Sequence, residues 1–277
     1  FCMSKMDTIE TAQKDEQCTC TAEKGTWSES INTLLFSDKM RIVYNVFRHI
    51  SNKTTLWYNS YRMRLKYRKA ENMKLYIIRH GETSWNKEKK LQGQHDIMLN
   101  DAGVRLAELT GEGMKDIDFD LVISSPLIRA KQTAELVMAG RHLPMITDRR
   151  IIELSFGDWE GECVKDSKVL PPDFIDKFYN DPYHCMKAPG GESFKDVLKR
   201  TEDFYQSLVQ NKAYENATIF ISTHGAAGRC LLANFYEDKE DIWRGGIPKN
   251  CSVCIVEVKD GVGTVLEKDK IFYDEAE

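Results

Sequence analysis

The chain has 277 residues, of which 42% are hydrophobic and 30% are charged, and its formal net charge is −4 at pH 7. This composition is typical of a globular protein with one or two domains, and no apolar run approaches the ~18–20 residues that span a bilayer. Eight cysteines in a chain of this length do not make a disulfide scaffold, and their spacing does not match a zinc site. We therefore expect reduced thiols, a cytoplasmic location, no metal and no cofactor.

The first 72 residues differ from the remainder in charge. They hold 12 Lys and Arg and 8 Asp and Glu, whereas residues 73–277 hold 27 basic and 35 acidic residues. Residues 41–70 contain eight basic residues, several aromatic ones and no acid, which could indicate a helix on a membrane surface or on nucleic acid. The alternative, which we favour, is a solvated appendage or sequence that is not normally translated. Residues 1–72 are thus predicted to be an N-terminal extension, either poorly ordered or an accessory helical segment.

From Met73 onward, short apolar runs alternate with segments of helical periodicity, a pattern that predicts an α/β fold. Asn100 is a predicted helix N-cap, Ser193 is predicted to open a helix, and Asp260-Gly261 predicts a hairpin turn. Between helices and strands lies a proline-containing excursion at 158–191, in which Phe174 and Phe178 could either pack against the domain or close over a substrate. The predicted strands are 75–79, 121–124, 145–147, 218–222, 252–259 and 263–272, and the predicted helices are 101–113, 125–139, 193–211 and 226–236.

Polar side chains follow the first of these strands directly. Arg79 and His80 stand at its end, and Gly81 behind them predicts a tight turn with close backbone approach. Open α/β sheets bind ligands at the carboxyl ends of their strands. An imidazole beside a guanidinium at that edge predicts a phosphate site that carries a nucleophile.

Four segments resemble motifs of the histidine phosphatase superfamily, which includes the phosphoglycerate mutases. They are Arg-His-Gly-Glu-Thr at 79–83, Ser-Ser-Pro-Leu-Ile-Arg-Ala followed by Gln-Thr-Ala within 124–134, Glu-Leu-Ser-Phe-Gly-Asp-Trp-Glu-Gly at 153–161, and Thr-His-Gly at 223–225. The resemblance implies a mostly parallel sheet flanked by helices on both faces, with residues 73–277 as the histidine phosphatase domain. The third segment and the loop at 91–93 look most like the small bacterial-type phosphatases, including alpha-ribazole-phosphate phosphatase.

The resemblance also implies a division of roles among five residues. His80 would attack phosphorus and become a phosphohistidine, as nucleophilic catalysis requires. Arg79, Arg129 and His224 would hold the phosphoryl oxygens and offset the charge that develops on them. Glu153 would protonate the leaving oxygen and then deprotonate the attacking water. No metal is required, because the cationic side chains supply the positive charge.

Further residues match pocket positions of the family less distinctively. The candidate substrate-binding residues are Asn86, Gln92, Gly225 and Ala226. Arg229 fits a downstream arginine of the family, and Glu160 is expected to be structural.

Three functions are compatible with these motifs. The leading hypothesis is a phosphomonoester hydrolase that acts on a small phosphorylated metabolite, with no nucleic-acid partner for the acidic catalytic domain. A phosphoglycerate mutase is the second, and a catalytically silent phosphate-binding module of the same fold is the third. The silent module is disfavoured because all five residues with implied catalytic roles are present. Oligomeric state does not follow from the sequence.

Overall fold

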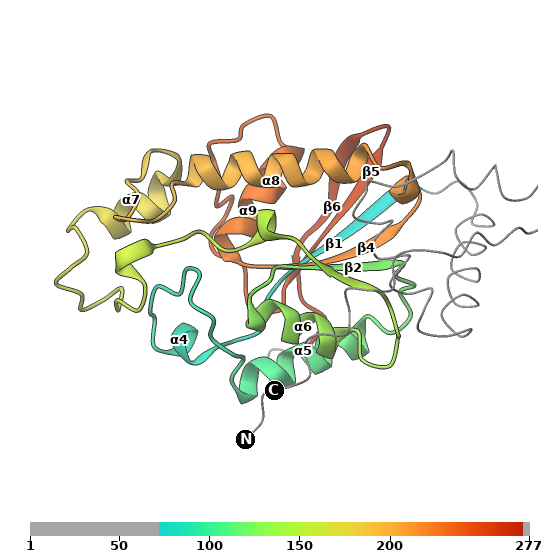
Figure 1. Cartoon of the computed structure of the whole chain (residues 1–277), viewed down its shortest axis with the longest axis horizontal. Helices are drawn as coiled ribbons and strands as arrows, with labels where there is room; N and C mark the ends of the chain where they lie inside the picture. Colours follow the sequence, from blue (N-terminus) through green and yellow to red (C-terminus); the bar gives the residue numbers. More distant parts are fainter. Residues whose placement is uncertain (1–71, 274–277) are drawn as a thin grey trace, which may run out of the picture. The chain divides into compact units, whose positions relative to one another are not determined.

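The computed structural model describes residues 72–273. The predicted N-terminal extension, with its basic segment at 41–70, lies outside the described residues. The described part contains one six-stranded sheet with strand order β3-β2-β4-β1-β5-β6 (Figure 1). Its strands are β1 (Met73–Arg79), β2 (Leu121–Ser124), β3 (Met145–Thr147), β4 (Thr218–Thr223), β5 (Val253–Lys259) and β6 (Val262–Lys270).

Four of the strands run parallel. β1 pairs with β4, β4 with β2 and β2 with β3 in parallel, whereas β5 is antiparallel to both β1 and β6. The turn between β5 and β6 has positive φ at Asp260 (51°) and Gly261 (79°), as a two-residue hairpin turn of the predicted kind requires. The predicted α/β fold with a mostly parallel sheet is therefore confirmed.

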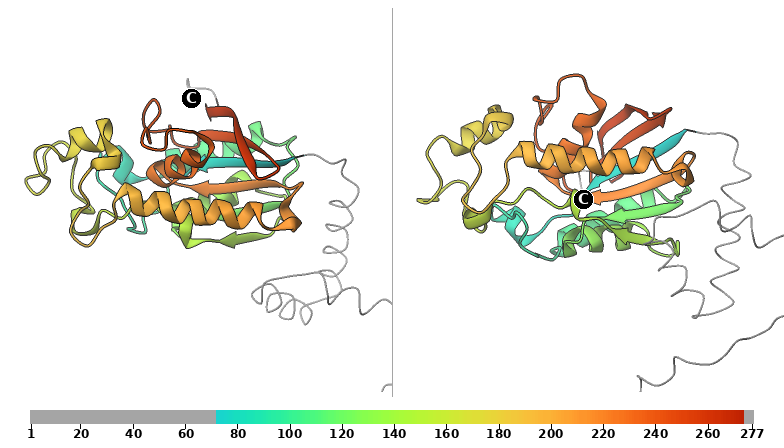
Figure 2. Two further views of the ribbon diagram at one scale, coloured as in Figure 1. Left: turned by 90° about the horizontal axis from the view of Figure 1, so that it is seen from above. Right: turned by 45° about the horizontal axis from the view of Figure 1, so that its top comes forward.

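Helices cover both faces of this sheet, as Figure 1 and the two views of Figure 2 show. Alternation along the strands explains this, because successive side chains point to opposite faces. The helices are α4 (Ser84–Lys87), α5 (Asp101–Gly113), α6 (Ile128–Val137), α7 (Phe174–Asn180), α8 (Phe194–Val209) and α9 (Gly225–Leu232). Leu75 and Ile77 pack toward α8 and α9, whereas Ile78 packs toward α5 and α6.

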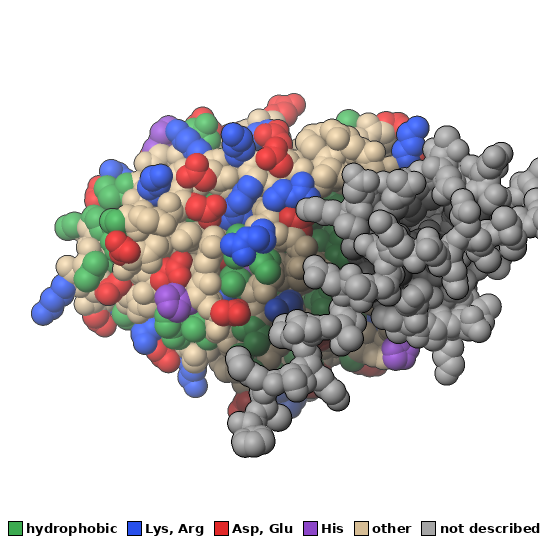
Figure 3. Space-filling view, in the orientation of Figure 1, with side chains coloured by type: hydrophobic (Ala, Val, Ile, Leu, Met, Phe, Trp, Pro, Cys, Tyr) green, Lys and Arg blue, Asp and Glu red, His purple; other side chains and the backbone are tan. Residues whose placement is uncertain are grey.

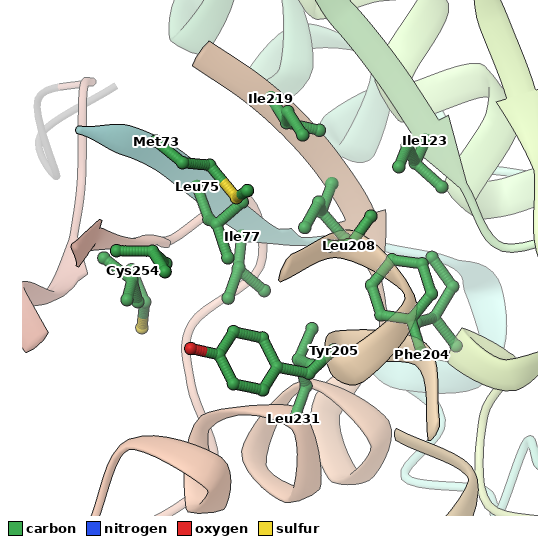
Figure 4. Packing of buried hydrophobic residues seen from close by; sticks show 14 of the residues in the cluster. Met73, Leu75, Ile77, Ile123, Phe204, Tyr205, Leu208, Ile219, Leu231 and Cys254 are labelled. Carbon is green, nitrogen blue, oxygen red and sulfur yellow. The ribbon is translucent and has the colours of Figure 1, made fainter. Parts of the chain in front are cut away.

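Figure 4 shows the apolar core between the sheet and helices α8 and α9. Leu75, Ile77 and Ile219 from the strands meet Phe204 of α8 and Leu231 of α9 there. On the opposite face a second buried cluster joins the strands to α5 and α6. With both faces covered, the central strands β1 and β4 are held firmly, and so are the residues that follow them.

Local side-chain caps account for three of the six helix starts, those of α4, α5 and α8. The side chain of Asn100 accepts from the Gly103 N–H at 2.8 Å, as expected of the predicted N-cap, and Ser193, the predicted start of a helix, forms a capping box with Asp196. The prediction for α6 was wrong at its start: the helix begins at Ile128 instead of residue 125. The Ile128 N–H donates to the carboxylate of Asp96 at 2.6 Å, so a residue distant in the sequence supplies this cap.

The excursion at 158–191 contains α7 and an aromatic cluster. Phe174 and Phe178 are only 2% and 6% exposed and pack against Phe156, Phe194 and Trp243. Of the two alternatives for this pair, packing against the domain is therefore the one observed. The indole N–H of Trp243 donates to the carbonyl of Phe178 at 2.6 Å, which ties α7 to the segment before β5.

Within residues 72–273, no helix combines the length and apolar character of a membrane span. On the face drawn in Figure 3, acidic and basic side chains are interspersed.

Candidate active site

The register of the sheet brings two histidines together. β1 and β4 pair in parallel up to Arg79 opposite Thr223, so His80 and His224 are the next residues of adjacent strands. The His80 N–H donates to the Thr223 carbonyl at 3.0 Å, and the two imidazole centroids lie 5.2 Å apart. Both side chains are buried, with exposed fractions of 2% and 1%.

His80 has a defined tautomer. Its Nδ1 lies 2.7 Å from the carbonyl oxygen of Gly81, and a carbonyl can only accept, so Nδ1 carries the proton. Nε2 is then the nitrogen with a free lone pair. Burial, together with the nearby Arg129 and Arg79 cations, holds the pKa of His80 well below its usual value, so the ring is neutral at pH 7.

The turn behind His80 is as tight as its glycine predicts. A Cβ on Gly81 would lie 2.5 Å from the carbonyl oxygen of Gly103 in α5. The Gly81 N–H donates to the hydroxyl of Thr133 in α6 at 2.9 Å. Backbone contacts with two helices therefore fix the position of His80.

Two arginines flank the histidine pair. Arg129 is fully buried and donates to the carbonyls of His95 and Gly93, each at 2.7 Å. Arg79 donates from Nη1 to the carbonyl of Pro248. Burial lowers the pKa of Arg129 to about 10, so this side chain stays charged at pH 7. In both guanidinium groups Nε is buried and has no hydrogen-bond partner in the described part of the chain.

Within the described residues, only one of the two ring nitrogens of His224 has a hydrogen-bond partner. Its Nε2 lies 2.7 Å from the hydroxyl oxygen of Ser125, at the end of β2. Its Nδ1 is buried and has no partner among residues 72–273. Burial, Arg129 and His80 lower the pKa of His224 well below its usual value.

The carboxylate of Glu153 lies at the N-terminus of α9. One oxygen accepts from the N–H groups of Gly225 and Ala226 at 3.0 and 3.3 Å, and the other from those of Ala227 and Leu154 at 3.0 and 2.8 Å. Because α9 begins directly after His224, this cap places Glu153 beside the histidine pair. Gly225 also borders Arg79, whose Nε would lie 3.8 Å from a Cβ added at that glycine.

The structure thus brings together the five residues with implied catalytic roles, but it places the other candidates differently. The N–H groups of Gly225 and Ala226 bind Glu153, as described above. The side chain of Asn86 caps α4 by accepting from the N–H and hydroxyl of Thr83, both at 3.1 Å. Gln92 is buried, and its amide oxygen has no partner in the described region.

Glu160 organises the loop that holds Arg129. Its carboxylate accepts from the Gln94 N–H at 2.9 Å and contacts Nδ1 of His95 at 2.7 Å. This loop supplies both carbonyls that bind Arg129. The expected structural role of Glu160 agrees with these contacts.

Sequence reasoning missed the segment before β5. The Pro248 carbonyl binds Arg79, and the Asn250 amide donates to the His80 carbonyl at 2.9 Å. Arg229 supports the same segment, since it donates to the Gly246 carbonyl at 2.9 Å and pairs with Asp269 at 2.7 Å. The segment contains no strand or long helix, so no periodicity could have revealed it.

In residues 72–273, no group of three or more His, Cys, Asp and Glu side chains could hold a metal ion. The five cysteines in this region are free thiols.

The part of the chain that contains these residues matches a known family in sequence. The profile of the histidine phosphatase superfamily (branch 1) covers residues 75–269. This chain belongs to that superfamily.

Its relatives include proteins named as phosphatases and others named as probable phosphoglycerate mutases. The uncharacterized phosphatase PhoE of Bacillus subtilis is 37% identical over 156 residues, which make up 56% of this chain and 74% of PhoE. The fructose-2,6-bisphosphatase TIGAR of Xenopus tropicalis is 38% identical over 159 residues, 56% of each protein. The crystal structure of a putative alpha-ribazole-5'-P phosphatase from Escherichia coli superimposes with a TM-score of 0.64 at 27% identity, covering 72% of this chain and 98% of that one. The expected likeness to small phosphatases is confirmed.

Proposed function

We propose that this protein hydrolyses small phosphomonoesters through a phosphohistidine at His80. The observation that carries the proposal is the convergence of His80 with Arg79, Arg129 and His224 at the carboxyl edge of the sheet. A neutral imidazole with a free Nε2 lone pair is a nucleophile, and the two cations beside it, buried Arg129 and half-buried Arg79, suit a phosphate dianion.

The proposed reaction has two steps. Nε2 of His80 attacks phosphorus, the bond to the ester oxygen breaks, and Glu153 gives a proton to the departing alcohol. Water then attacks the phosphohistidine, Glu153 takes a proton from it, and His80 and inorganic phosphate are released. Arg79, Arg129 and His224 bind the phosphoryl oxygens in both steps and stabilise their negative charge.

Two partly exposed side chains border the site and suit the organic part of a substrate. Ile247 is 40% exposed, and its Cγ2 would lie 3.9 Å from a Cβ on Gly225. Tyr179 of α7 is 43% exposed, and the Arg79 charge partly offsets the raised pKa that burial gives its phenol. We propose that these residues contact the alcohol portion, which favours a small metabolite over nucleic acid.

We also propose a cytoplasmic location, which the cysteines support. All five in the described region are free thiols, as expected in a reducing cytoplasm.

A phosphatase is favoured over a mutase because PhoE and TIGAR, which are named as phosphatases, are 37% and 38% identical to this chain, whereas GpmB of Yersinia pestis, named as a probable phosphoglycerate mutase, is 29% identical. The experiment that tests the proposal is a screen of phosphomonoesters, with isomerisation of phosphoglycerate measured alongside. We expect phosphate release from several esters, with and without EDTA. Isomerisation without phosphate release would instead identify a mutase, and activity that EDTA abolishes and Mg²⁺ or Zn²⁺ restores would contradict the metal-free reaction.

A matched pair of variants links the activity to the site. His80→Ala should lower kcat by several orders of magnitude, because a nucleophile has no substitute. His184→Ala is the control, since His184 is an exposed histidine whose ring pairs with Asp181. Near-normal turnover by His80→Ala would refute the proposal.

A further inference from the structure

Ser125 contacts His224 at the junction of two buried strands. β2 and β4 pair in parallel up to Ser124 opposite Ser222, and the Ser125 N–H donates to the Ser222 carbonyl at 2.9 Å. Ser125 is 0% exposed and His224 1%. The 2.7 Å distance between the Ser125 hydroxyl and His224 Nε2 is therefore a hydrogen bond shielded from water.

The hydroxyl has one hydrogen, and its surroundings decide where that hydrogen goes. Its oxygen already accepts from the Leu127 N–H at 3.3 Å. Apart from His224 Nε2, residues 72–273 offer the hydroxyl no hydrogen-bond acceptor. If Nε2–H donated to Ser125, the hydroxyl hydrogen would be buried without a partner, which is unfavourable.

The reverse direction satisfies both groups. When the Ser125 hydroxyl donates to Nε2, a neutral imidazole must carry its proton on Nδ1. The ring is neutral in the free protein, because burial and the arginine charges lower the pKa of His224. The tautomer of the neutral ring therefore determines whether Nδ1 presents a proton or a lone pair.

Nδ1 is the atom left for a ligand. It is buried and has no partner in the described part of the protein. With a proton it can donate to a phosphoryl oxygen, whereas without one its lone pair would repel the same oxygen.

We propose that Ser125 is a positioning residue whose hydroxyl donates to Nε2 of His224 and so fixes the Nδ1–H tautomer that binds the phosphoryl group. This inference rests on the proposed function in one respect, namely that His224 contacts the phosphoryl group. It requires nothing of the identity of the nucleophile.

The tautomer can be measured directly in the full-length protein. Nitrogen-15 NMR of the histidine rings distinguishes an Nδ1–H from an Nε2–H imidazole, and His224→Gln assigns the signals. We expect Nδ1–H for His224 in the wild type at pH 7. In Ser125→Ala the Nε2–H form should appear, whereas Ser125→Thr should keep Nδ1–H because it retains a hydroxyl.

Binding of inorganic phosphate supplies the second readout. Ser125→Ala should weaken it about tenfold or more, as loss of a hydrogen bond to a charged group predicts. Ser222→Ala is the matched control, because that buried hydroxyl donates to the Ala130 carbonyl at 2.8 Å and does not contact His224. It should leave both tautomer and phosphate affinity unchanged.

Three outcomes would overturn the proposal. They are an Nε2–H signal for His224 in the wild type, an Nδ1–H form that persists in Ser125→Ala with normal phosphate affinity, and an equal loss of affinity in Ser222→Ala. If Ser125→Ala does not fold, the wild-type spectrum and Ser125→Thr still decide. Neither readout depends on turnover. Failure of the phosphohistidine route would be seen separately, as a near-normal kcat in His80→Ala.

Discussion

At the scale of single residues, the site is defined by hydrogen-bond direction as much as by proximity. The Gly81 carbonyl leaves Nε2 of His80 free, and the Ser125 hydroxyl leaves Nδ1 of His224 free. Glu153 is fixed by three backbone N–H groups at the start of α9 and by the N–H of the next residue, Leu154. The sequence motifs name these residues, but the directions follow only from contacts between segments distant in the chain.

The acid role of Glu153 predicts a dependence on the leaving group. Glu153→Gln keeps the shape of the side chain but cannot donate a carboxyl proton. We expect kcat/KM to fall about 100-fold or more on alkyl phosphates, within the usual range for general acid catalysis. On p-nitrophenyl phosphate the loss should be much smaller, because nitrophenolate leaves without protonation. Equal losses on the two substrates would remove Glu153 from this role.

At the scale of elements, the bounds of a helix could be predicted when the residue that caps it is close in the sequence. The bounds of α5 were predicted correctly because its cap, Asn100, is adjacent in the sequence. The start of α6 was misplaced because Asp96 caps it from 32 residues away. The segment that binds Arg79 through the Pro248 carbonyl was missed because this contact also joins residues that are far apart in the sequence. His80 and His224 nevertheless lie together because they follow the adjacent parallel strands β1 and β4, whereas Arg129 comes from α6 and Glu153 from a loop.

Two helical glycines should respond differently to substitution by alanine. A Cβ on Gly103 in α5 would lie 2.1 Å from the carbonyl oxygen of Glu82, beside the turn behind His80. Gly103→Ala should therefore reduce the free energy of unfolding by about 1–3 kcal/mol and lower kcat.

Gly228 in α9 is the matched case, because its added Cβ would meet nothing closer than Thr223 Cγ2 at 3.4 Å. Gly228→Ala should be neutral or stabilising by up to about 1 kcal/mol, from helix propensity. Urea denaturation measures both changes. Similar effects of the two substitutions would show that the close approach of α5 to the turn is unimportant.

At the scale of the whole molecule, the buried histidines link stability to pH. In the folded state the pKa values of His80 and His224 are lowered well below 6.5, so below that pH the unfolded state binds more protons. The free energy of unfolding should therefore be fully retained above about pH 6.5 and decrease as the pH falls below it. Each histidine contributes a slope of up to about 1.4 kcal/mol per pH unit.

Denaturant titrations at pH 7.5 and 5.5 test this linkage. His80→Gln and His224→Gln should each flatten the pH dependence of the free energy of unfolding. If the free energy of unfolding depended on pH in the same way in both variants as in the wild type, the linkage to His80 and His224 would be contradicted.

The predicted domain boundary is also a property of the whole molecule. Residues 72–273 contain the complete sheet, both covering layers of helices and all five catalytic candidates. We therefore propose that a protein beginning at Met73 folds and keeps the kcat/KM of the full chain on a small phosphoester. Insolubility, or activity at a small fraction of the full-length rate, would show that residues 1–72 belong to the catalytic domain.

The central claim is the covalent phosphohistidine at His80, and trapping it is the most direct test. The enzyme would be quenched during turnover of a radiolabelled phosphomonoester, and the labelled peptide identified by mass spectrometry. We expect a phosphoryl group that is labile in acid and stable in base, attached to the peptide containing His80 and absent from His80→Ala. Label on His224 or on another residue, or sustained turnover without any labelled enzyme, would contradict the account.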